Sequence, residues 1–267
     1  MRAVVSRPRR TLAILAGLLT LVAAAQAAPP KYRDWLDLRR GGVQTVLADA
    51  RQQSAPQPWQ ATYGAKLPAG HPALSQFASL KLTITRAPPL SLGQPGRTLV
   101  RIEEPEFAKG WGVLVEGGKA WLRTGDKIEE VGPGRLSQPW PKLGIAPVVF
   151  VASEFSAQFE SSIEGEFGDT AVLRFKPRYE AGPDVMPLKA GLSKRYGAWV
   201  LGEVDDRKGK QLSRIEWLEP KLMGAVPVPE ALRVHLPGGD AAAVTLERLD
   251  LKVGEQVRWT GGAKALK

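Results

Sequence analysis

Four short segments of alternating apolar and polar residues follow one another between Thr98 and Val131, and their spacing favours an antiparallel meander. The two central segments flank Gly117-Gly118. Two consecutive glycines suit a two-residue hairpin turn, because both turn positions require positive φ. The sequence therefore predicts strands at Thr98–Ile102, Trp111–Glu116, Lys119–Arg123 and Ile128–Val131.

The period of the apolar residues changes after this meander. Apolar side chains recur at spacings of four, three, four and four residues, which is typical of one helical face, and Pro147 stands where a helix could begin. The pattern predicts a helix over Val148–Ile163 whose apolar face carries Val148, Ala152, Phe155, Phe159 and Ile163. Such a face beside a curved sheet forms either an ordinary core or the wall of a pocket.

The rest of the chain adds further strands and one more helix. Upstream, Tyr32–Gln53 has a loose amphipathic stripe and predicts a helix, Ser54–His71 predicts a loop, and Phe77–Thr85 predicts a strand. Together with the downstream segments this predicts the α+β class with a dominant antiparallel sheet. The downstream segments are a strand at Thr170–Lys176, a loop at Tyr179–Ser193, a hairpin of Tyr196–Glu203 and Leu212–Glu219, and strands at Ala231–Leu236, Ala243–Leu246 and Leu249–Val253.

The N-terminus has the pattern of a cleaved secretory signal. Four arginines within the first ten residues precede the apolar run Leu12–Ala25, and Ala25-Gln26-Ala27 offers a cleavage site. An uncleaved membrane anchor is the alternative, but this run is short of the roughly 20 residues that span a bilayer. The chain has no cysteine, so it has neither a disulfide nor a lipobox. We therefore expect a signal over residues 1–27 and a single periplasmic domain over residues 28–267.

The charge is positive but dispersed. The formal net charge is +10, and removing the four arginines of the signal leaves +6. Acidic and basic residues alternate along the chain, which is typical of a solvated surface, with weak attraction to anionic lipid head groups as the alternative. Nucleic acid is not an expected partner, because the exported chain carries no nucleic-acid-binding motif.

The sequence offers little material for catalysis. It contains two histidines, His71 and His235, and neither belongs to a nucleophile or metal motif. We therefore predict that the protein is not an enzyme and binds no metal or cofactor. A hydrolase of envelope lipids with His235 as its base is the competing hypothesis.

Eight tryptophans are distributed along the chain. Trp111 and Trp121 lie in the central hairpin, where strand alternation does not settle whether they share a face. Core packing is one interpretation, and an aromatic-lined groove for an apolar ligand is the other.

The segment TLVRIEEPEFAKGWGVLVEGGKAWLRTGDKIEEV, from Thr98 to Val131, resembles the LolA-like outer-membrane lipoprotein-sorting proteins of the LolA/LolB/RseB superfamily. The shared pattern is a strand ending in a proline, a Lys-Gly step, a hairpin carrying an aromatic residue, and a strand ending at a loop. The resemblance continues into ASEFSAQF, which is similar to the family's helix start. The step Trp121-Leu122-Arg123-Thr124-Gly125 departs from the family pattern because it lacks a tyrosine and a proline.

The resemblance implies a strongly curved antiparallel sheet that forms an unclosed β-barrel, with helices plugging the open side over a cavity for acyl chains. It implies a monomeric periplasmic carrier of acylated lipoprotein or lipid cargo, with an inner-membrane exporter or outer-membrane acceptor as partner. An RseB-like sensor or adaptor that docks on a membrane protein is the alternative. The residues expected to line the cavity are Trp111, Leu114, Trp121, Phe150, Phe155, Phe159, Leu173 and Phe175.

Overall fold

The structure is a computed structural model, and its contacts divide the chain into residues 1–30 and residues 31–267. The predicted signal, the predicted helix Tyr32–Gln53 and Phe155 lie outside the described residues. No helix within the described part is long and apolar enough to cross a membrane. The structure describes residues 57–66, 77–89, 96–152, 154, 159–167, 169–177, 187–193, 195–196, 198–224, 226–235 and 243–267.

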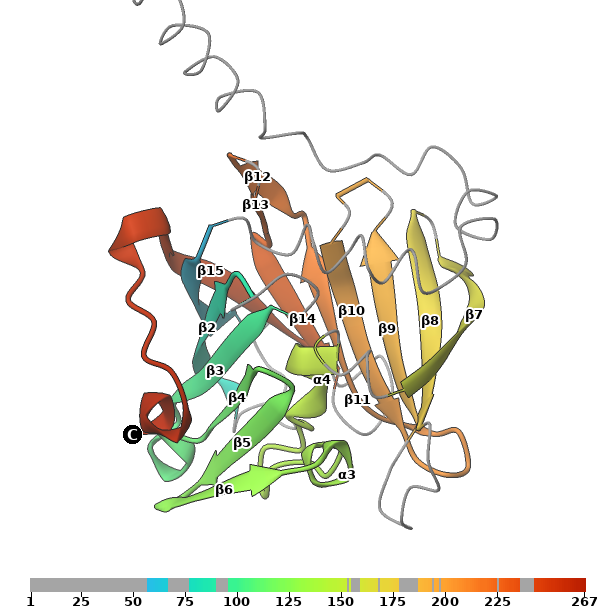
Figure 1. Cartoon of the computed structure of the whole chain (residues 1–267), viewed down its shortest axis with the longest axis horizontal. Coiled ribbons are helices and arrows are strands. Elements are labelled where there is room, and N and C mark those ends of the chain that lie inside the picture. Colours follow the sequence, from blue (N-terminus) through green and yellow to red (C-terminus); the bar gives the residue numbers. More distant parts are fainter. Residues whose placement is uncertain are drawn as a thin grey trace, which may run out of the picture. The chain divides into compact units, whose positions relative to one another are not determined.

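The described part is dominated by one antiparallel sheet of thirteen strands (Figure 1). Its order is β6-β5-β4-β3-β2-β1-β15-β14-β11-β10-β9-β8-β7. The first half contains β6 (Lys127–Val131), β5 (Lys119–Thr124), β4 (Gly112–Glu116), β3 (Arg97–Glu104), β2 (Lys81–Ala87), β1 (Trp59–Lys66) and β15 (Ala243–Val253). The second half contains β14 (Ala231–His235), β11 (Gln211–Leu218), β10 (Ala198–Asp205), β9 (Leu188–Ser193), β8 (Thr170–Pro177) and β7 (Phe159–Phe167).

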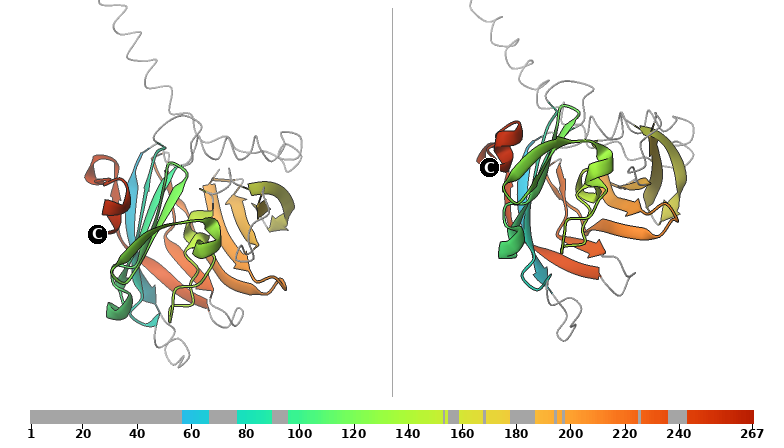
Figure 2. Two further views of the ribbon diagram at one scale, coloured as in Figure 1. Left: turned by 60° about the horizontal axis from the view of Figure 1, so that its bottom comes forward. Right: turned by 90° about the horizontal axis from the view of Figure 1, so that it is seen from below.

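The sheet is not closed, because β6 and β7 form its two edges and do not pair with each other. The chain between these edges contains two short α-helices, and Figure 2 shows α4 on the inner side of the bent sheet. The smaller elements are α3 (Pro133–Leu136), α4 (Val148–Val151), the 3-10 helices η2 (Glu106–Ala108), η5 (Gly254–Gln256) and η6 (Ala263–Leu266), and the separate hairpin of β12 (Lys221–Met223) and β13 (Val226–Val228).

Strand alternation builds the core. One cross-strand row runs through five strands, and every residue in it is buried because successive partners point to the same face of the sheet. This row consists of Ala61, Ile84, Val100, Val113 and Leu122.

The meander is confirmed. Gly117 and Gly118 have φ values of 60° and 79°, as a two-residue hairpin between β4 and β5 requires. The predicted hairpin of β10 and β11 is also confirmed, and so are the strands predicted near β2, β3, β6, β8 and β14. Together these elements confirm an unclosed antiparallel sheet with few helices.

The predicted helix over Val148–Ile163 is wrong beyond its first turn. The helix α4 ends at Val151, and Phe159–Phe167 forms the edge strand β7 instead. Phe159 and Ile163 are four residues apart, and that spacing places two residues on one face of a strand as well as on one face of a helix. Pairing with β8 decides between the two in favour of the strand.

Two segments that were predicted as loops contain strands, and two segments that were predicted as separate strands form one continuous strand. The loop predicted at Ser54–His71 contains β1, and the loop predicted at Tyr179–Ser193 contains β9. The final two segments form the single strand β15. β1 has an alternating core face of Trp59, Ala61 and Tyr63, but Gln, Ala and Gly lower its intrinsic strand propensity. Pairing on both sides, with β2 and β15, overrides that preference.

Candidate functional site

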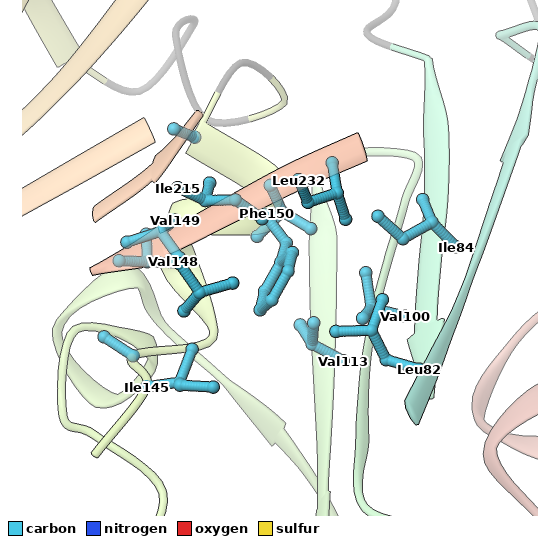
Figure 3. Close-up of a cluster of buried hydrophobic side chains, with 14 of the residues drawn as sticks. Leu82, Ile84, Val100, Val113, Ile145, Val148, Val149, Phe150, Ile215 and Leu232 are labelled. Atoms are coloured by element: carbon cyan, nitrogen blue, oxygen red, sulfur yellow. The ribbon is translucent and has the colours of Figure 1, made fainter. Parts of the chain in front are cut away.

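The helix α4 lies inside the bent sheet and is buried on all sides. Its four residues are apolar, and each is at most 5% exposed. Figure 3 shows Phe150 pointing from α4 towards Val100 and Val113, with Ile215 on the opposite side. An apolar helical turn therefore packs against the inner face of the sheet at β10 and β11.

The backbone of α4 lies directly on β10. A Cβ added to Gly202 would stand 2.0 Å from the carbonyl oxygen of Val149, which is far inside van der Waals contact. Glycine is therefore the residue that permits this approach. The segment before α4 is fixed as well, since the Ala146 N–H donates a 3.3 Å hydrogen bond to Ser213 Oγ on β11.

A buried polar cluster holds the other end of α4. Arg86 Nη2 on β2 donates a 3.4 Å hydrogen bond to the carbonyl oxygen of Phe150 and lies 4.0 Å from the Glu154 carboxylate. The Thr98 hydroxyl donates to the same carboxylate. The Arg86 guanidinium also lies 4.8 Å from the ring centroid of Trp217. Arg86 therefore links β2, α4, Glu154 and β11 in one contact set.

Burial makes this cluster energetically important. The side chains of Arg86 and Glu154 are 12% and 5% exposed. Removing Arg86 would take a cationic partner away from the Glu154 carboxylate in a weakly polar environment, which is costly. Arg86 also accounts for one of the terminal helix carbonyls that have no partner within the helix. The cluster is thus a polar attachment for a helix whose other contacts are apolar.

The predicted ligand-binding residues divide between two clusters. Phe150, Leu173 and Phe175 belong to the main core, and Trp111 packs against it. Leu114 and Trp121 belong to a second cluster with the C-terminal residues Ala265 and Leu266. Phe159 lies in β7, and nothing further is described of its side chain. Leu114 and Trp121 are paired on one face of the β4–β5 hairpin, whereas Val113 and Leu122 are paired on the other face, which belongs to the main core.

Sequence reasoning missed Arg86, Glu154 and Gly202. For Arg86 a signal was present: Leu82 and Ile84 define the inward face of β2, and the next residue on that face is Arg86. A charged residue at an inward strand position calls for a buried partner. Glu154 follows α4 and supplies that partner, which no local pattern indicates.

His235, the candidate base, lies on β14 and is 5% exposed. Its Nε2 atom is 3.6 Å from Glu216 Oε2, and Arg214 and Arg233 also contact that carboxylate. These residues belong to a row of charged side chains on the face of the sheet opposite the core. His235 therefore stands in an ion-pair network.

This network predicts an acid-sensitive contribution to stability. The adjacent His235 and Arg214 lower the pKa of Glu216 from 4.5 to about 2, although burial opposes the shift. Because the folded-state pKa is depressed, the contribution is present above the ordinary pKa and is lost as the pH falls from about 4.5 to about 2. Glu216→Gln should flatten the pH dependence of the free energy of unfolding in this window, as measured by urea denaturation.

Glu255→Gln is the matched control, because Glu255 is exposed. It should keep the wild-type pH dependence. A Glu216→Gln variant that loses stability with acid as steeply as the wild type would contradict this assignment.

Comparison with known proteins places this architecture among solved structures. No family model and no curated protein matches the sequence. A domain from Vibrio parahaemolyticus described as an outer membrane lipoprotein-sorting protein superposes with a TM-score of 0.55 at 14% identity, over 82% of this chain and 94% of that one. A DUF1329 family protein from Desulfovibrio piger superposes with a TM-score of 0.53 at 10% identity, over 80% and 92% of the two chains.

A LolA superfamily protein from Nitrosomonas europaea gives a TM-score of 0.47 at 15% identity, over 78% of this chain and 92% of that one. The first two superpositions extend across nearly the whole of each solved chain, so they concern the complete sheet and not a local motif. The resemblance inferred from Thr98–Val131 is therefore confirmed at the level of fold: this chain has the fold of the outer-membrane lipoprotein-sorting domain.

Proposed function

We propose that the protein is a carrier or chaperone that shelters an acyl chain of a lipoprotein or lipid against the inner face of its sheet and passes it towards the outer membrane. The observation that carries this proposal is α4, an apolar helical turn that lies against the inner face and is attached by the contacts of Arg86. In this proposal the acyl chain takes the place of α4, and Phe150 moves with the helix. Leu173 and Phe175 would then contact the acyl chain.

The free energy of burying the apolar side chains of α4 is comparable to that of burying an acyl chain. Burying a Val or Phe side chain is worth about 1.5–3 kcal/mol, so the four residues of α4 contribute roughly 6–12 kcal/mol. A palmitoyl chain has roughly fourteen methylenes, each worth about 0.8 kcal/mol, for a total of roughly 11 kcal/mol. Neither occupant dominates, which is what reversible loading and release require. The reaction is an exchange of apolar contacts and needs no catalytic residue.

Trp111 stands at the margin of the main core and would contact the end of a long chain. Leu114 and Trp121 are not included in the proposed binding face, because they pack with the C-terminal segment. The proposal places the protein outside the inner membrane, as the predicted signal requires.

Titration with a fluorescent acylated peptide tests this function. We expect saturable binding by the acylated peptide and none by the same peptide without its acyl group. Phe175→Asp should weaken binding at least about tenfold, because a charge on the inner face opposes an apolar ligand. Circular dichroism would verify that this variant remains folded. Equal binding of the two peptides would contradict the proposal.

A further inference from the structure

A second site lies on the other face of the sheet. The C-terminal segment crosses the side of the first half of the sheet that faces away from α4 (Figure 2). Between this segment and strands β1, β2 and β3 is a pocket of about 270 Å³. That volume is at the lower limit of small-molecule pockets, which measure about 300–1,000 Å³. It suits a head group or small anion better than a whole lipid.

The C-terminal segment is firmly attached above this pocket. The Glu116 carboxylate accepts hydrogen bonds from the Gly262 N–H at 2.7 Å and from Trp259 Nε1 at 2.9 Å. Burial alone would raise the pKa of Glu116, but these hydrogen bonds and Arg97 outweigh it and lower the pKa. Arg123 Nη1 donates a 2.6 Å hydrogen bond to the carbonyl oxygen of Leu266. The pocket is thus bounded by a fixed segment on one side and the sheet on the other.

The pocket gathers positive charge. Four basic side chains line it, and Glu103 is the single acidic side chain among its lining residues, all of which are described. The four are Arg101, Arg258, Lys264 and Lys267, and none of them forms an ion pair with a described residue. By contrast, the neighbouring Arg97 on β3 is paired with Glu116 at 3.4 Å. Basic side chains without an ion pair therefore line this pocket.

One donor in the pocket is both buried and unsatisfied. Arg101 Nε is inaccessible to solvent and has no hydrogen-bond partner among the described residues. A buried donor without a partner is costly, so an acceptor bound in the pocket would satisfy it. Thr85 adds a hydroxyl: its oxygen accepts from Gln60 at 2.9 Å, which leaves its own proton available for donation.

We propose that this pocket binds a phosphate group. Guanidinium groups offer planar, paired donors to phosphate oxygens, an ammonium group adds charge, and hydroxyls complete the donor set. Arg101 is the central donor, with Arg258 and Lys264 contributed by the C-terminal segment. The phosphate belongs either to a lipid head group at a membrane surface or to a soluble phosphate compound. This site is separate from the proposed acyl-binding face and does not depend on it.

Calorimetric titration of the full chain with inorganic phosphate and with glycerol phosphate, at low salt, tests the site. We expect saturable binding with one phosphate per chain. Arg101→Gln should weaken phosphate affinity about tenfold or more, because the loss of one hydrogen bond to a charged group corresponds to about that change in affinity. Lys264→Gln, at an exposed position, should weaken it as well without disturbing the fold.

Lys208→Gln is the matched control, because it makes the same change of charge in the exposed turn between β10 and β11. It should leave phosphate affinity unchanged. No saturable binding of either phosphate compound, or equal affinities in the wild type, Arg101→Gln and Lys264→Gln, would overturn the proposal.

Binding to phospholipid vesicles distinguishes a lipid head group from a soluble phosphate compound as the ligand of the pocket. Sedimentation of the protein with phosphatidylglycerol vesicles, lost in Arg101→Gln and displaced by inorganic phosphate, would support the site with a lipid head group as its ligand. Binding of soluble phosphate without sedimentation would support the site with a soluble ligand. If Arg101→Gln and Lys208→Gln weakened sedimentation equally and no soluble phosphate bound, the proposed site would be wrong. The protein would then bind vesicles through its general surface charge.

Discussion

Replacing Arg86 by methionine should lower the free energy of unfolding by about 3–5 kcal/mol, as measured by urea denaturation. The substitution removes the contact of Arg86 with the Glu154 carboxylate, which is 5% exposed, and it removes the hydrogen bond to the carbonyl oxygen of Phe150. It also removes the guanidinium from its contact with Trp217. Arg207→Met makes the same chemical change in an exposed turn and should cost less than about 0.5 kcal/mol.

A double-mutant cycle separates the contribution of the Arg86–Glu154 ion pair to stability from the contribution of side-chain size. Replacing both Arg86 and Glu154 by methionine removes both charges, and apolar replacement of a complete buried pair is often close to neutral. We therefore expect the double variant to be more stable than Arg86→Met. Equal stability of Arg86→Met and the wild type, or strictly additive losses, would show that the pair does not hold α4.

Replacing Gly202 by valine should expel α4 from its position. The added Cβ would lie 2.0 Å from the Val149 carbonyl oxygen, and a backbone atom cannot yield as a flexible side chain can. Overpacking of this kind costs about 1–3 kcal/mol in the free energy of unfolding. If α4 moves away, the inner face should also become accessible, which an increase in the fluorescence of an apolar dye such as ANS would report.

Gly132→Val is the matched control, because a Cβ at Gly132 meets nothing within 4 Å and its backbone is extended with a φ of −85°. Because Gly132 is the N-cap of α3, Gly132→Val should cost less stability than Gly202→Val and should leave dye fluorescence at the wild-type value. Unchanged stability of Gly202→Val with no rise in fluorescence would mean that α4 does not depend on its close approach to β10.

The parts of the fold predicted from sequence are those whose signals are local. The hairpin around Gly117-Gly118 was predictable because its turn chemistry and its alternating strands occur within a few residues. The segment Val148–Ile163 was not, because apolar residues four apart satisfy two periodicities. Its division into α4 and β7 depends on β8, which pairs with β7 after the sheet has formed.

The candidate site likewise contains features with a local sequence signal and features that depend on contacts between distant segments. The family resemblance led to the expectation that Phe150 lines a cavity, and the structure buries Phe150 in the main core. The separation of Trp121 from that core depends on the C-terminal segment, which covers the other face of the hairpin from more than a hundred residues away. The pairing of Arg86 with Glu154 likewise joins distant segments. Contacts of this range follow from tertiary packing and leave no short pattern in the sequence.

The central claim is that an acyl chain binds against the inner face of the sheet in place of α4. Photo-crosslinking with a peptide that carries a diazirine-labelled acyl chain tests it most directly, with mass spectrometry locating the labelled residues. We predict labels on the inner face of the sheet, on or near Leu173 and Phe175. Labels confined to the outer face around Leu114 and Trp121, or no labelling above that of the non-acylated peptide, would contradict the claim.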